Sequence, residues 1–212
     1  MSTSHNEESI THELADDSRL LVDSLGGTRG MLESGLPSIV FVIVYAINES
    51  NLRLSIYGAL VSGLILAALR LVQKQKLTQV VAGLIGLGFS AWLATKSGKS
   101  EDFFLPSILT NVAYATAFLV SIAINKPILG YVIESLNGTS RKWTAEIHLM
   151  RKYRALTFLW FAVFAIRVLV MTPLYLANNT VALGFFKLAL GFPLFALAAY
   201  ATYAMSIRKT NP

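Results

Sequence analysis

Six long apolar runs, separated by short polar segments, dominate this sequence of 212 residues. Each run has about the length that a helix needs to cross a bilayer, roughly 17–25 residues. In lipid a helix satisfies its own backbone hydrogen bonds, whereas an open sheet does not. The chain is therefore predicted to be an all-α, polytopic membrane protein. The six predicted transmembrane helices span residues 31–47, 54–72, 77–95, 103–124, 156–177 and 181–207.

The distribution of charge supports this prediction and gives an orientation. Only 14% of the residues are charged, against about 25% in soluble proteins. With the N-terminus placed inside, the segments on that side hold thirteen Lys and Arg residues, and those on the other side hold three. Cytoplasmic loops carry an excess of basic residues. We therefore expect a plasma-membrane protein with both termini in the cytoplasm.

The two cytoplasmic segments differ in charge. Residues 1–30 form an acidic tail, which contains six acidic residues and two arginines. Apolar residues on one helical face, from Ile10 to Leu25, indicate a short amphipathic helix. The loop 125–155 is basic. The tail could dock on this loop or remain solvated.

Several classes of function have no support in the residues. The chain has no cysteine, and its three histidines lie outside the apolar runs. No nucleophile, histidine and acid can be assembled, and no phosphate-binding loop is present. We therefore expect no enzyme activity, no metal and no cofactor. The isoelectric point near 9.6 reflects basic loops, so nucleic acid is not expected as a partner either.

An internal repeat relates the first three runs to the last three. Residues 36–39 recur as 105–108, residues 68–71 resemble 165–168, and residues 87–89 recur as 190–192. Every match pairs one predicted helix with the third one after it. Because that helix enters from the opposite side, the repeat is predicted to be a 3+3 inverted repeat, which is typical of secondary transporters. Chance similarity among apolar segments is the alternative.

Specific motifs suggest a family. They are Gly26-Gly27-Thr28-Arg29-Gly30, Glu33-Ser34, Leu36-Pro37, Ala68-Leu69-Arg70-Leu71-Val72-Gln73, Glu101-Asp102-Phe103-Phe104-Leu105-Pro106, and Arg167 followed by Pro173-Leu174-Tyr175. From about residue 24 to 208 the chain resembles an actinobacterial membrane family, domain-of-unknown-function 3159, a resemblance that implies no activity. It is more loosely similar to the intracellular septation protein A family, through the Leu-Pro helix ending in Tyr and Phe185-Phe186-Lys187. That similarity implies a role in envelope synthesis or division, although the Asn of the family's last motif is missing.

Arg167 and Lys187 lie inside apolar runs. A charge at the bilayer centre costs about 2.5–3.5 kcal/mol on insertion scales, and such residues usually face the protein interior. A short connection makes the last two helices neighbours, so both cations could share one cavity and bind a small anion. Pairing within the bundle and snorkelling to the outer interface are the alternatives. Glu33 and the pair Glu101 and Asp102 are the available counter-charges, although the pair is rather expected to form an external cap before the fourth helix.

Two polar stripes and one face of small residues complete the candidate residues. Ser34, Ser38 and Tyr45 lie on one face of the first helix. Ser107, Asn111 and Tyr114 lie at helical spacing on the fourth. These stripes could line a pathway between the halves or form interhelical hydrogen bonds. The third helix presents small residues at every fourth position, which predicts close packing within the bundle or across a homo-oligomer. They are Ala82, Gly86, Ser90 and Ala94.

Two functions remain open from the sequence. The first is a transporter-like or channel-like protein with a cationic cavity between its halves. The second is a non-transporting membrane factor in cell-envelope biogenesis or division, whose partners would be envelope or division proteins.

Overall fold

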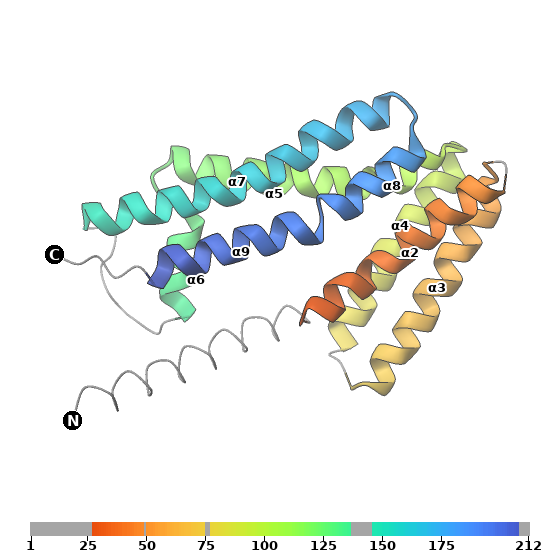
Figure 1. The fold of residues 1–212 in the computed structure, drawn as a ribbon, viewed down its shortest axis with the longest axis horizontal. Helices are drawn as coiled ribbons and strands as arrows, with labels where there is room; N and C mark the ends of the chain where they lie inside the picture. The colour runs from red at the N-terminus through yellow and green to blue at the C-terminus, as the bar shows by residue number, and fades with distance from the viewer. Residues whose placement is uncertain (1–26, 49, 75–76, 137–145, 208–212) are drawn as a thin grey trace.

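The helical prediction is confirmed over the part of the chain that the structure describes. The computed structural model describes residues 27–48, 50–74, 77–136 and 146–207, and these contain helices and no strand. The helices are labelled as in Figure 1. In chain order they are α2 (Gly27–Ile47), α3 (Leu52–Val72), α4 (Leu77–Ser97), the 3-10 helix η1 (Ser100–Phe103), α5 (Leu105–Ala123), α6 (Ile128–Leu136), α7 (Ile147–Leu176), α8 (Thr180–Ala189) and α9 (Phe192–Ile207).

Five helical segments are long and apolar enough to cross a membrane. Their bounds are Leu52–Val72, Leu77–Ser97, Leu105–Ala123, Ile147–Leu176 and Thr180–Thr202. The side chains of α2 are described from Gly35 onward, and this apolar part, Gly35–Ile47, is shorter than a full span. A membrane protein with five candidate spans is therefore supported, and the sixth span stays a prediction. The acidic tail before residue 27 lies outside the described residues.

Local sequence explains how the helices begin and end. The side chains of Asn51 and Asn179 cap α3 and α8 by accepting hydrogen bonds from Leu54 N at 3.1 Å and Ala182 N at 3.0 Å. Such caps satisfy backbone donors that the first turn leaves free. Asn125 and Asn178 follow α5 and α7 with φ of 56° and 54°. This left-handed conformation commonly ends a helix, and asparagine tolerates it well.

The segment predicted as a loop over 125–155 contains regular structure. It holds α6 and the first turns of α7, which begins at Ile147 rather than at residue 156. With 30 residues, α7 is about 45 Å long, so it extends past a bilayer core of about 30 Å. The early turns carry basic residues, which lowered the apolar signal without preventing a helix. Residues 137–145 lie outside the described part.

The last predicted span, 181–207, is two helices rather than one. A turn at residues 190 and 191 separates α8 from α9. Pro193 has no N–H to continue the α8 ladder. A Cβ on Gly191 would lie 2.7 Å from the carbonyl oxygen of Lys187, so this turn requires glycine. The fourth predicted span is also corrected at its start, where η1 precedes α5.

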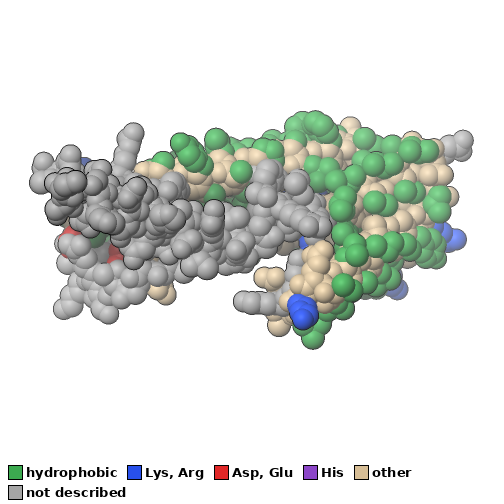
Figure 2. Space-filling model, turned by 60° about the horizontal axis from the view of Figure 1, so that its bottom comes forward, with side chains coloured by type: hydrophobic (Ala, Val, Ile, Leu, Met, Phe, Trp, Pro, Cys, Tyr) green, Lys and Arg blue, Asp and Glu red, His purple; other side chains and the backbone are tan. Residues whose placement is uncertain are grey.

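The helices form two groups inclined to each other (Figure 1). In one group α3 packs against both α2 and α4, and in the other α7 packs against α5, α8 and α9. The groups contact each other through α2 with α8, α4 with α5, and η1 with both α4 and α8. Many exposed side chains are apolar, and Figure 2 shows them in green over most of the described surface in that view. Such a surface suits lipid rather than water.

Candidate functional site: two cationic cavities

The groups meet at a packed region that we call the junction, formed by residues 100–104 with neighbouring parts of α2, α7 and α8. Phe103 and Phe104 are 2% and 0% exposed. The ring of Phe41 stacks on Phe103 with 4.1 Å between centroids and meets Phe104 edge to face. Aromatic pairs in these arrangements contribute beyond the area that they bury. The junction is therefore the main point of attachment between the two groups.

Two carboxyl side chains are buried in the junction. Glu101 and Asp102 are each 6% exposed. Tyr175 Oη donates a hydrogen bond to Asp102 Oδ1 at 2.5 Å, and Ser100 Oγ donates to Glu101 Oε2 at 3.4 Å. Ser100 Oγ also lies 2.6 Å from Thr180 Oγ1. Both carboxyls lie in the first turn of η1, and neither side chain caps α5. Asp102 connects η1 to the end of α7, and Ser100 connects it to the start of α8. Their place on the external side stays a prediction.

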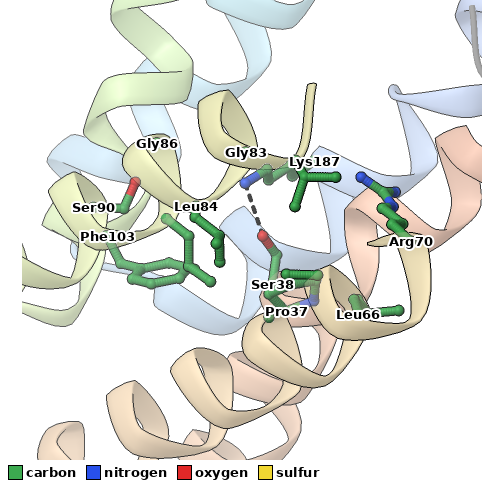
Figure 3. A pocket seen from close by; sticks show the side chains of 14 residues that line it. Pro37, Ser38, Leu66, Arg70, Gly83, Leu84, Gly86, Ser90, Phe103 and Lys187 are labelled. Atoms are coloured by element: carbon green, nitrogen blue, oxygen red, sulfur yellow. Dashed lines mark hydrogen bonds between the residues drawn. The ribbon is translucent and has the colours of Figure 1, made fainter. Parts of the chain in front are cut away.

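A cavity of about 180 Å³ lies between α2, α3 and α4, beside the junction. We call it the Lys187 cavity (Figure 3). Lys187 Nζ donates a hydrogen bond to Ser38 Oγ at 2.8 Å and lies 5.4 Å from the centroid of the Phe104 ring. Gly83 and Gly86 are among its lining residues, and a Cβ on either would meet no heavy atom within 4 Å. Small side chains leave this space open, and the ammonium group projects into it.

Two local features position Lys187. It lies in the last turn of α8, where the helix dipole favours a cation. Gly184, one turn earlier, allows α8 to approach α2, because a Cβ there would lie 2.0 Å from Val42 Cγ2. Ser38, which accepts the hydrogen bond, is 6% exposed on α2. The Lys187 side chain thus points to an interior partner rather than to a helix end.

Arg70 is the second cation of the Lys187 cavity, and the sequence analysis did not select it. It lies in the last turn of α3, and its guanidinium is seen on the right of Figure 3. Arg70 stands near the end of an apolar run, where a basic residue is predicted to belong to the cytoplasmic side. Its match to Arg167 in the internal repeat was the signal that could have found it.

Arg167 lies in a separate, more open groove of about 390 Å³. We call it the Arg167 groove. The guanidinium Cζ is 5.4 Å from the centroid of the Phe195 ring on α9. Its Nε is buried and has no hydrogen-bond partner among the described residues. The lining residues come from α5, α7 and α9: Ser107, Thr110, Asn111, Tyr114, Phe164, Arg167 and Phe195.

The polar residues of α5 hold different positions in the Arg167 groove. Asn111 is 4% exposed, and its Nδ2 donates to the carbonyl oxygen of Ser107 at 2.6 Å. Tyr114 is 52% exposed, and its ring lies 5.0 Å from that of Phe164. The stripe predicted on the fourth helix therefore lies beside Arg167.

The structure differs from the expectation of one cavity for both cations. Lys187 projects from α8 toward α2, whereas Arg167 projects from α7 between α5 and α9. Of the other predicted site residues, Ser38 joins Lys187. Tyr45 stacks on Phe41 with 6.1 Å between centroids, and the side chain of Glu33 lies outside the described ones.

The small residues on α4 are only partly used for packing within the chain. Ala94 is fully buried. Gly86 and Ser90 line the Lys187 cavity, and a Cβ on Gly86 would meet no heavy atom within 4 Å. Ala82 is exposed. Packing of this face across a homo-oligomer stays a prediction.

The two cavities share a chemical character. Each has at least one cation, hydroxyl groups and an aromatic ring, and among the described residues neither lining includes a carboxylate. Lysine and arginine donate charge-assisted hydrogen bonds to anions. Such surroundings favour binding of an anion over binding of a cation.

Comparison with known proteins identifies a family and no activity. Neither a curated protein nor a solved structure matches the chain. A family model described as protein of unknown function (DUF3159) matches residues 25–212, which covers all the helices described above. The chain therefore belongs to this family of proteins of unknown function.

Proposed function

We propose that this protein is a membrane transporter that carries a small anion through the Lys187 cavity. The observation that carries the proposal is the position of Lys187, in the last turn of a discontinuous helix and directed into a cavity that Arg70 also lines. Interrupted helices often form the binding sites of secondary transporters. The hydroxyl of Ser38, 2.8 Å from Lys187 Nζ, would turn toward the anion or give way to it.

Arg70 and Lys187 would act at successive positions along the cavity. Arg70 lies near the end of α3, while Lys187 lies beside Phe104 of the junction. An anion would meet Arg70 first and then Lys187, where aromatic packing blocks further movement. Under the orientation given by the basic loops, Arg70 is on the cytoplasmic side. Passage across the membrane then requires the junction to open.

An inverted repeat would provide such a movement, and two observations support it. In the predicted repeat α2 corresponds to α5, and α4 corresponds to α8 and α9. The contact of α2 with α8 therefore corresponds to the contact of α5 with α4, and both contacts are present. The cavities also use matching positions: Ser38 and Arg70 line one, and their counterparts Ser107 and Arg167 line the other. We expect six spans in two halves that tilt against each other about the junction.

Anion efflux from proteoliposomes tests this function. Vesicles containing the purified protein would be loaded with chloride, nitrate or inorganic phosphate, and efflux would be followed with and without Lys187→Met. A hydrogen bond to a charged group contributes about 1.5–3 kcal/mol. We therefore expect Lys187→Met to slow efflux by about tenfold or more. Lys96→Met, which removes an exposed lysine near the end of α4, is the matched control and should leave efflux unchanged.

Two results would contradict the proposal. One is the absence of protein-dependent efflux for all three anions, and the other is equal efflux with wild type and Lys187→Met. In either case, the role in envelope synthesis or division that the similarity to septation protein A implies would become the better interpretation.

A further inference from the structure

The Arg167 groove lies between α5, α7 and α9, which belong to three of the candidate membrane spans. Tyr114, at its edge, is 52% exposed. In a bilayer the open side of a groove between membrane-spanning helices borders lipid. A molecule that reaches the groove from this side therefore comes from the membrane.

One buried hydrogen-bond donor of the groove has no partner among the described residues. Arginine has five N–H donors and remains charged in proteins. Arg167 contacts the ring of Phe195, yet its buried Nε has no hydrogen-bond partner among the described residues. Leaving a buried charged donor unsatisfied is unfavourable. The tyrosine hydroxyl of Tyr114, near Phe164, is the further donor at the open edge.

A phosphate group fits these donors. The planar guanidinium can donate two parallel hydrogen bonds to phosphate oxygens. The residues that line the groove include no carboxylate that would repel it. The aromatic rings of Phe164 and Phe195 would contact the apolar part of an amphiphilic ligand.

We propose that the Arg167 groove binds the phosphate of an anionic phospholipid that enters laterally from the bilayer. This inference does not depend on transport through the Lys187 cavity, because the two cavities are lined by different residues. A free anion would have to cross the apolar surface to reach Arg167, whereas a lipid brings its phosphate to the groove with its chains still in the membrane.

Native mass spectrometry of the purified full chain tests the lipid ligand. The protein in detergent would be titrated with phosphatidylglycerol or with phosphatidylcholine of the same acyl chains. We expect wild type to retain phosphatidylglycerol preferentially, and Arg167→Gln to weaken that binding by about tenfold or more. Arg53→Gln, at an exposed arginine of α3, is the matched control and should bind as wild type does. No preference for phosphatidylglycerol, or equal binding by Arg167→Gln, would overturn the proposal.

A competition arm separates lipid from free phosphate. Millimolar inorganic phosphate should leave the phosphatidylglycerol complex intact, because the acyl chains contribute to its binding. Displacement of the lipid by inorganic phosphate would show that the groove is a site for soluble anions and would overturn the lipid proposal. The Lys187→Met protein should retain phosphatidylglycerol, so failure of anion efflux and failure of lipid binding can be told apart.

A second measurement keeps Arg167 in place, in case Arg167→Gln does not fold. Since the chain has no cysteine, Thr110→Cys gives a unique fluorophore site in the groove, and Leu169→Cys gives one on the exposed apolar surface. Brominated phosphatidylglycerol should quench the label at position 110 more than brominated phosphatidylcholine does, while both should quench equally at position 169. Equal quenching by the two lipids at position 110 would contradict the proposal.

Discussion

At the junction, aromatic rings fill the space between the helices, whereas toward Arg70 glycine and alanine leave a cavity. The two regions lie next to each other, and Phe103 borders both. Polar groups also differ between them. The junction pairs its buried carboxyls with hydroxyl donors, while the cavity holds cations. The difference indicates that the junction stabilises the fold and that the cavity is kept open for a ligand, at the expense of packing.

The largest effect should come from the aromatic packing of the junction. Phe41 is fully buried and stacks on Phe103, so Phe41→Ala removes contacts that lipid cannot replace. We expect a loss of about 3 kcal/mol in the free energy of unfolding, seen as a lower melting temperature in detergent. Phe89→Ala is the control because Phe89 is 51% exposed. Equal melting temperatures for the two variants would remove the distinction between the junction and the cavity.

A smaller loss is expected for the hydrogen bond to the buried carboxyl of Asp102. Tyr175→Phe removes the donor at 2.5 Å and leaves a carboxyl that is 6% exposed with fewer partners. The expected cost is about 2 kcal/mol, measured by thermal unfolding. Tyr200→Phe should have almost no effect, since Tyr200 is 70% exposed. If both variants melt as wild type does, the junction does not depend on this hydrogen bond.

The smallest effect should be a gain in stability at the cavity. A Cβ on Gly86 meets no heavy atom within 4 Å, and alanine is favoured over glycine inside a helix by about 0.5–1 kcal/mol. Gly86→Ala should therefore raise the melting temperature slightly. Gly184→Ala should lower it, because the added Cβ would lie 2.0 Å from Val42 Cγ2. A loss of stability in Gly86→Ala would instead favour packing of this face across a homo-oligomer.

Uninterrupted apolar runs gave the most accurate sequence predictions. The predicted spans 54–72 and 77–95 lie within α3 and α4, because each is mainly apolar and bounded by polar residues. The interruption between α8 and α9 was missed because the prediction relied on apolar runs alone. Both helices are apolar, so a count of apolar residues does not detect the turn, which could have been predicted only from Gly191 and Pro193. Charged residues in the first turns of α7 had the opposite effect: they interrupted the apolar run, so the predicted span began at residue 156 although the helix begins at Ile147.

The sequence indicated several individual residues of the candidate site, but it did not indicate how these residues are grouped into cavities. Lys187 and Ser38 were both selected, and the structure brings them within hydrogen-bonding distance. Arg167 was selected with Ser107 and Asn111, which also lie together. Which cation belongs to which cavity depends on the direction of each side chain around its helix and on the angle between the two groups. Neither quantity is encoded in a single apolar run.

Thiol labelling from each side of the membrane tests most directly whether the cavity opens only on the Arg70 side. Ser90→Cys places a unique thiol in the Lys187 cavity, while Lys74→Cys and Lys99→Cys mark the two opposite sides. A membrane-impermeant thiol reagent would be added to vesicles of each orientation. We predict that position 90 reacts from the same side as position 74 and is protected from the side on which position 99 reacts. Reaction at position 90 from the position 99 side, or from neither side, would contradict the account.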